Sequence, residues 1–388
     1  MSISLESRSD ARPRGGQAVG AMVFPKLARR GKGKSVELAE GGARAGWDAP
    51  YSWSTIIPSR RRQESIEGVL IGCAIGEGLA RLPWRRRLDL GAYRGLLCPG
   101  SRTDEMIITI QSLLLSQAAT ENFCRNLEKR MVWYRRSSPF LWMVRGLGRG
   151  VRKLAGGSGL VDFPGSDPLV RAMVLSVVMQ GHHEGVLRWV HKSTQMSDRW
   201  GEVTQAAMVV ATAAQCAQFH QTAYAVGPVE MLGSLSEAVE SRDLRLQLQG
   251  LGSGVLEGLE IREMVKRMGG EGRWRDDLVG NALLGVYTYA RHLGDLRGGM
   301  EELLGIPGDL RGVASIFGGL GAIHSGVAGI PGDWRGALSL YPYGEEWVQG
   351  YVDRCLDWPH GPDDIQETMP LPSHPFGQLI RNFRRMFR

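Results

Sequence analysis

The sequence predicts an all-α fold, arranged as a single compact multi-helix domain. Small and apolar residues recur at helical spacing through most of the chain, and the alternation that marks strands is nearly absent. Several apolar segments also begin with residues that favour a helix start, such as Asp-Pro at 167–168. The 43% of hydrophobic residues supports a buried core, and the 53 glycines favour close helix packing or many turns.

The first 62 residues are predicted to form a basic, disordered tail. They hold 12 Lys and Arg residues against 5 Asp and Glu residues, which accounts for the net charge of +7. The helical domain that follows, 63–358, is therefore close to neutral and is not expected to bind nucleic acid. For the tail itself, a basic arm for nucleic acid or membrane and a misassigned start codon both stay open. Residues 359–388 form a Pro-rich and basic C-terminal extension.

Segments with helical spacing follow one another along this domain. The segment at 103–119 begins with Thr and Asp, which favour the first turn of a helix. The segment at 201–226 is Ala-rich and almost uncharged inside, which predicts a buried central helix. The expected helices lie within 65–82, 103–119, 121–136, 167–180, 201–226, 229–240, 251–268, 278–293 and 313–329.

The cysteines and the hydropathy pattern indicate the cellular setting. No two of the five cysteines have the spacing of metal ligands, so we expect reduced thiols in the cytoplasm. No apolar run reaches the 18 residues that a membrane span requires.

One eight-residue phrase occurs twice, as GIPGDLRG at 305–312 and as GIPGDWRG at 329–336. A stacked repeat and a phosphate-binding glycine loop are both disfavoured, because the intervening segments differ and no strand precedes the glycines. Asp309 and Asp333 instead favour helix N-termini, with Gly and Pro shaping the turn before each helix.

Taken in order, the segments resemble the ADP-ribosylglycohydrolase family over about Ser65 to Trp334. The resemblance implies an all-α fold of that type, a pair of Mg²⁺ ions bound between helices, and removal of ADP-ribose from modified protein. It rests on GVLIGCAIGEGLARLPWR (68–85), GSRTDEMIITIQSLL (100–114), GSDPLVRAM (165–173), NALLGVYTYARHLGD (281–295), GDLRGVASIFGGLGA (308–322) and GIPGDW (329–334).

The chain departs from the family's pattern where acidic metal ligands are expected. Arginine replaces an acid at Arg85, Arg102 and Arg311, and arginine neither accepts a hydrogen bond nor loses its charge. Three further positions carry another residue than the family's pattern, with Glu77 in place of Asp, Ser101 in place of Asp and Gly312 in place of Thr. A shift of one or two residues in the second motif would instead offer Asp104 and Glu105 as acids.

The resemblance and these departures together predict a pseudoenzyme that binds ADP-ribose, an ADP-ribosylated protein or a related acidic ligand. Glu77 and Asp309 are interpreted as vestigial catalytic residues, and Thr103, Asp104 and Asp309 as the ligands of any retained Mg²⁺. The expected ligand-binding residues are Arg85, Arg102, Thr103, Ser166, Asp167, Arg171, Gly308, Arg311 and Gly312. Two alternatives stay open. One is an active Mg²⁺-dependent hydrolase using Glu77, Asp104, Glu105 and Asp309, and the other is a structural or regulatory partner protein that uses the basic tail.

Overall fold

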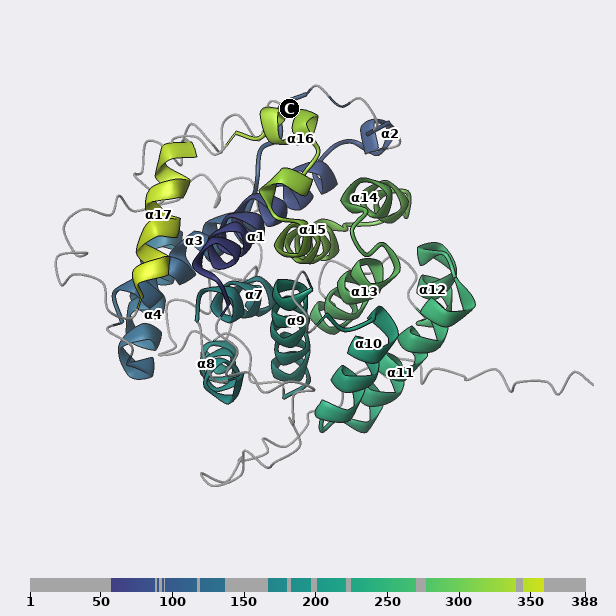
Figure 1. Ribbon diagram of the computed structural model, residues 1–388, viewed down its shortest axis with the longest axis horizontal. Coiled ribbons are helices and arrows are strands. Elements are labelled where there is room, and N and C mark those ends of the chain that lie inside the picture. Colours follow the sequence, from purple (N-terminus) through teal and green to yellow (C-terminus); the bar gives the residue numbers. More distant parts are fainter. Residues whose placement is uncertain are drawn as a thin grey trace, which may run out of the picture.

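The structure is a computed structural model, and its regular secondary structure is helical (Figure 1). One isolated bridge joins Leu97 and Leu338, and the described part of the chain contains no other strand-like pairing. The all-α prediction is therefore confirmed. The structure describes residues 57–87, 89–90, 93, 95–116, 119–136, 167–179, 183–196, 201–220, 225–269, 277–339 and 345–358. The predicted tail before residue 57 and the predicted extension from 359 lie outside these ranges.

The helices account for most of the segments that the sequence predicts. In chain order they are α1 (Ser59–Ala80), α2 (Trp84–Arg87), α3 (Ser101–Leu114), α4 (Thr120–Arg136), α7 (Pro168–Val178), α8 (His183–Gln195), α9 (Gly201–Phe219), α10 (Pro228–Ala238), α11 (Arg242–Glu257), α12 (Ile261–Arg267), α13 (Leu278–Arg291), α14 (Leu296–Leu304), α15 (Arg311–Ser325), η2 (Val327–Gly329), α16 (Gly332–Ala337) and α17 (Glu345–Asp357). No helix in the described ranges is long and apolar enough to cross a membrane.

Two differences from the sequence prediction have local causes. The single segment expected at 251–268 is divided between α11 and α12, because Gly258 adopts a left-handed conformation (φ 69°) that ends α11. Helices α2, α8, α14 and α17 were not predicted, although α14 has a side chain that caps its start. Its N-cap, Asp295, accepts a hydrogen bond from the backbone N–H of Gly298 at 2.8 Å.

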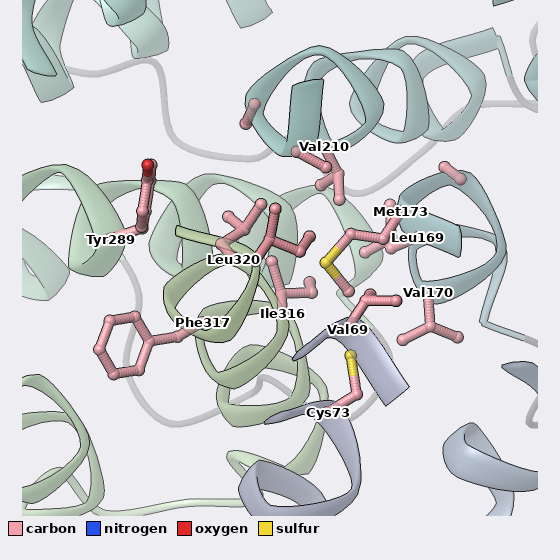
Figure 2. Packing of buried hydrophobic residues seen from close by; sticks show 14 of the residues in the cluster. Val69, Cys73, Leu169, Val170, Met173, Val210, Tyr289, Ile316, Phe317 and Leu320 are labelled. Carbon is pink, nitrogen blue, oxygen red and sulfur yellow. The ribbon is translucent and has the colours of Figure 1, made fainter. Parts of the chain in front are cut away.

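The centre of the domain is the pair formed by α1 and α15, which pack along each other closely. Gly72 on α1 faces Gly318 on α15, and the two backbones approach so closely that neither position has room for a Cβ atom. Figure 2 shows Val69 and Cys73 of α1 beside Ile316 of α15 in the core that these helices share with α7 and α9. The expectation of close helix packing through glycine is confirmed at this interface.

Helix α1 begins at Ser59, so Arg61 and Arg62 belong to the folded domain and not to a solvated tail. Both arginines are buried. Arg61 donates to the carbonyls of Ala217, Gln218, Ile323 and His324 at the ends of α9 and α15. Arg62 donates to the carbonyls of Val178, Cys355 and Leu356 at the ends of α7 and α17. Because the last carbonyls of a helix have no partner within it, the two arginines satisfy groups that would otherwise be buried unpaired.

His324 beside Arg61 gives the domain an expected dependence on pH. Its ring stacks on His220 with 3.8 Å between centroids, and Nδ1 lies 3.1 Å from the Tyr289 hydroxyl. Burial, His220 and Arg61 lower the pKa of His324 to about 4. Since the unfolded chain then binds more protons than the folded one, stability is lost as the pH falls below about 6.5.

We expect this group alone to reduce the free energy of unfolding by about 2 kcal/mol between pH 7 and pH 5. Urea unfolding of the wild type and of His324→Gln at both pH values checks it. The loss on acidification should be smaller in the variant, and equal losses in the two proteins would contradict the expectation.

Candidate functional site

The N-terminal ends of four helices, α3, α7, α13 and α15, meet at one place. Arg102, the second residue of α3, donates from Nε to Oδ2 of Asp167, the N-cap of α7, at 2.6 Å. Gly312, the second residue of α15, lies beside Asn281 in the first turn of α13 and beside Arg102. We call the place formed by Arg102, Asp167, Asn281 and Gly312 the N-terminal junction. Each helix N-terminus carries a partial positive charge, so their convergence favours an anion.

Glu77, near the end of α1, supports the first turn of α3. Its carboxylate is buried and accepts hydrogen bonds from the backbone N–H groups of Gly100, Arg102 and Thr103 and from the Thr103 hydroxyl, at 2.7 to 3.3 Å. The Glu77 carboxylate thereby satisfies backbone N–H groups that have no acceptor within α3. Gly100 leaves the necessary space, because a Cβ atom there would lie 2.6 Å from Cδ of Glu77. Glu77 and Thr103 are therefore hydrogen-bonded to each other at the edge of the junction.

The ion pair of Arg102 and Asp167 lies at the centre of the junction. The Asp167 side chain is 2% exposed and the Arg102 side chain 16%. Asp167 also caps α7 by accepting from the backbone N–H of Leu169 at 3.2 Å. Burial opposes the charge of Arg102, but Asp167, Glu77 and Asp309 outweigh it and raise the pKa of Arg102. Arg102 is thus a fixed cation whose two Nη atoms donate to no described residue.

The turn before α15 places a second ion pair on the outer side of the junction. Asp309 accepts from Nε and Nη2 of Arg311 and, at 3.4 Å, from the Arg311 backbone N–H. Burial opposes the charge of Asp309, but these bonds from Arg311 outweigh it and lower the pKa of Asp309. Gly308, with φ 121°, presents its carbonyl to Nη1 of Arg87 at 3.3 Å. The prediction that Asp309 and Asp333 lie at helix N-termini is confirmed. Asp309 lies in the turn directly before α15, and Asp333 lies in the first turn of α16.

A third ion pair, between Arg171 and Glu105, lies in the interior. The two side chains are 2% and 3% exposed. Arg171 also donates to the carbonyl of Ser193 at 3.0 Å, and Glu105 accepts from the backbone N–H of Asp167 at 2.9 Å. The expectation that Arg171 contacts a ligand is not supported by this position. Arg171 instead holds Glu105 in place beneath the backbone of Asp167.

The remaining predicted residues fall in three different settings. Asp104 is fully buried in the first turn of α3. Arg85 is exposed on α2, and no contact from it reaches the junction. Ser166 lies outside the described residues.

Sequence reasoning missed two residues of this site. Arg87, two residues after the predicted Arg85, is the arginine of α2 that reaches the turn at Gly308. Asn281 was included only as the first letter of a helical segment. It is 1% exposed, and neither Oδ1 nor Nδ2 has a hydrogen-bond partner among the described residues. No spacing rule identifies either residue, because both depend on how distant helices pack.

The residues at this place do not fit a pair of Mg²⁺ ions. Mg²⁺ requires several oxygen ligands in near-octahedral arrangement. Here the carboxylates of Glu105, Asp167 and Asp309 are each paired with an arginine, and Glu77 accepts from the first turn of α3. No three or more His, Cys, Asp or Glu side chains in the described ranges are arranged to hold a metal ion. The alternative set of Glu77, Asp104, Glu105 and Asp309 therefore does not form such a group.

Comparisons with known proteins agree with this architecture. The model of a protein family described as ADP-ribosylglycohydrolase matches residues 58–363. Among solved structures, a chain of an ADP-ribosylglycohydrolase-related protein complex is similar with a TM-score of 0.52 at 20% identity. The similarity covers 76% of this chain and 98% of that chain, and at this identity it establishes the fold. No match was found among curated proteins.

Proposed function

The chain belongs to the ADP-ribosylglycohydrolase family, and from this premise we propose that it binds ADP-ribose or a related acidic ligand without a metal and without hydrolysing it. The observation that carries the proposal is the pairing of Arg102 with Asp167 and of Arg311 with Asp309. In each pair a guanidinium group neutralises a carboxylate, which is the role that a bound cation would otherwise have.

The arginines are suited to binding an anion. Arg102 uses Nε for Asp167, and Arg311 uses Nε and Nη2 for Asp309, so each keeps donors for a ligand. The planar guanidinium group binds phosphate oxygens well through such donors. Arg85 and Arg86 are exposed on the neighbouring α2 and add positive charge. A diphosphate at this place would meet cations and helix N-termini together.

The carboxylates are poorly suited to catalysis. Hydrolysis of a glycosidic bond passes through an oxocarbenium-like state and needs a group that activates water. An effective general base has a pKa near the working pH. Arg311 lowers the pKa of Asp309, and Glu77 already accepts four hydrogen bonds. Neither carboxylate is left as a strong base, which favours binding over hydrolysis.

Titration calorimetry with ADP-ribose tests this function. We expect binding in the presence of EDTA with a Kd within about twofold of the value measured with Mg²⁺. Because a charge-assisted hydrogen bond contributes about 1.5–3 kcal/mol, we expect Arg102→Gln to weaken binding by at least roughly tenfold.

The matched control is Arg267→Gln, which removes an exposed arginine that pairs with Glu257 on α11. It should leave the affinity for ADP-ribose unchanged. Mg²⁺-dependent release of ADP-ribose from a modified protein would contradict the proposal and support the active hydrolase. Absence of ADP-ribose binding under both conditions would also contradict it.

A further inference from the structure

The side-chain amide of Asn281 is a buried polar group without a hydrogen-bond partner in the described ranges. The residue is 1% exposed, and both Oδ1 and Nδ2 lack hydrogen bonds. Buried polar groups in folded proteins are nearly always hydrogen-bonded, and leaving one unpaired is costly. An apolar side chain of similar size would avoid this cost, so the amide calls for a partner that the described part of the chain does not supply.

The amide points at the start of α15. A Cβ atom on Gly312 would lie 2.7 Å from Nδ2 of Asn281 and 3.2 Å from Nη2 of Arg102. The missing side chain of Gly312 therefore makes room for the Asn281 amide, which lies against the backbone of α15 beside Arg102. No side chain caps α15 at its N-cap residue, Leu310. The N–H groups of its first turn have no acceptors within the helix, and of these the Arg311 N–H donates to Asp309 at 3.4 Å.

The chemistry of these groups defines what they bind together. Arg102 and the first turn of α15 offer only hydrogen-bond donors and positive charge, which suit a phosphoryl oxygen. Asn281 offers a donor and an acceptor, and its acceptor requires a hydroxyl or N–H group on the ligand. A phosphorylated sugar carries an anionic oxygen near hydroxyl groups and matches both requirements.

We infer that Asn281, Gly312 and Arg102 form a ligand subsite in which the Asn281 amide recognises a hydroxyl group next to a phosphoryl group. This inference rests on the proposed function, because it assigns a contact within the same binding site. It gives Asn281 a role in specificity that is separate from the charge contributed by Arg102.

Asn281→Leu tests the inference, because a structural role and a binding role predict opposite changes. If the amide serves only a ligand, the variant without ligand should melt at the wild-type temperature or a few degrees above it. Its affinity for ADP-ribose and for ribose 5-phosphate should fall roughly tenfold, the loss expected for one buried hydrogen bond. Its affinity for inorganic diphosphate, which has no sugar hydroxyl, should stay within about twofold of wild type.

Thr288→Val is the matched control on the same helix. Thr288 is buried on α13 but is satisfied by the carbonyl of Leu284 at 2.8 Å. This variant should keep all three affinities.

Three outcomes separate the inference from the proposed function. If Asn281→Leu binds ADP-ribose as tightly as wild type, or if it melts well below wild type, the inference is wrong and the proposed function is unaffected. If the wild type binds ribose 5-phosphate but not ADP-ribose, and the variant loses the former, the inference holds, and the proposed function fails for ADP-ribose and holds only for a related acidic ligand. If the wild type binds none of the probes, both fail.

Discussion

Gly72→Ala is expected to lower the free energy of unfolding by about 3 kcal/mol or more, at the upper end of the usual cost of overpacking. A methyl group on Gly72 would lie 2.9 Å from the carbonyl carbon of Gly318 and 2.5 Å from Cβ of Ala322. Because the first of these is backbone, the overlap cannot be relieved by rotating a side chain. Helices α1 and α15 would have to separate, and both contribute to the buried core and to the junction.

Gly233→Ala is the matched control for this prediction. Gly233 lies in α10 with nothing within 4 Å of an added Cβ. Alanine is the better helix former, so this variant should be more stable by about 0.5–1 kcal/mol. Chemical denaturation of both variants measures the two effects. Equal stability of Gly72→Ala and wild type would show that the α1–α15 interface is less close than the structure indicates.

Removing the guanidinium of Arg171 is the second change with a large expected effect. Arg171→Leu leaves Glu105 buried without its cation, and breaking a buried ion pair in this way costs about 3–5 kcal/mol. The Ser193 carbonyl also loses its donor. We expect a clear loss of thermal stability, with or without ligand.

The double variant Arg171→Met with Glu105→Gln separates charge from packing. Neutralising both partners should recover much of the lost stability, because neither charge is then left buried alone. The amide oxygen introduced by Glu105→Gln would still accept from the Asp167 backbone N–H that now bonds the carboxylate. If the double variant is no more stable than Arg171→Leu, the buried charge is not the cause of the loss. Thermal unfolding of the three proteins provides the comparison.

Helical periodicity identified the helices well, because it is a local property of the chain. The Asp-Pro start of α7 and the Asp309 and Asp333 turns follow from the first few residues of each helix. The boundary of the folded domain was placed too late for a different reason. Arg61 and Arg62 resemble the basic tail in composition, yet they bond carbonyls more than a hundred residues away.

In the site, too, the sequence identified some of the residues, and only the structure showed what the others contact. The resemblance identified Arg102, Asp167, Asp309 and Arg311 as residues of one place, and the structure brings them together. It did not show that Glu77 accepts from the first turn of α3, that Arg171 is an interior support, or that Arg87 donates to the carbonyl of Gly308.

The sequence by itself determined the all-α fold and the order of most helices, and from the family resemblance it predicted a loss of acids at the expected metal-ligand positions. Only the tertiary structure decided what the remaining charges do. An ion pair such as Arg102–Asp167 joins residues from helices whose packing is set by the whole core. Asn281 became a candidate site residue only because it is buried with no hydrogen-bond partner in the described part of the chain, which is a property of its surroundings and of no motif.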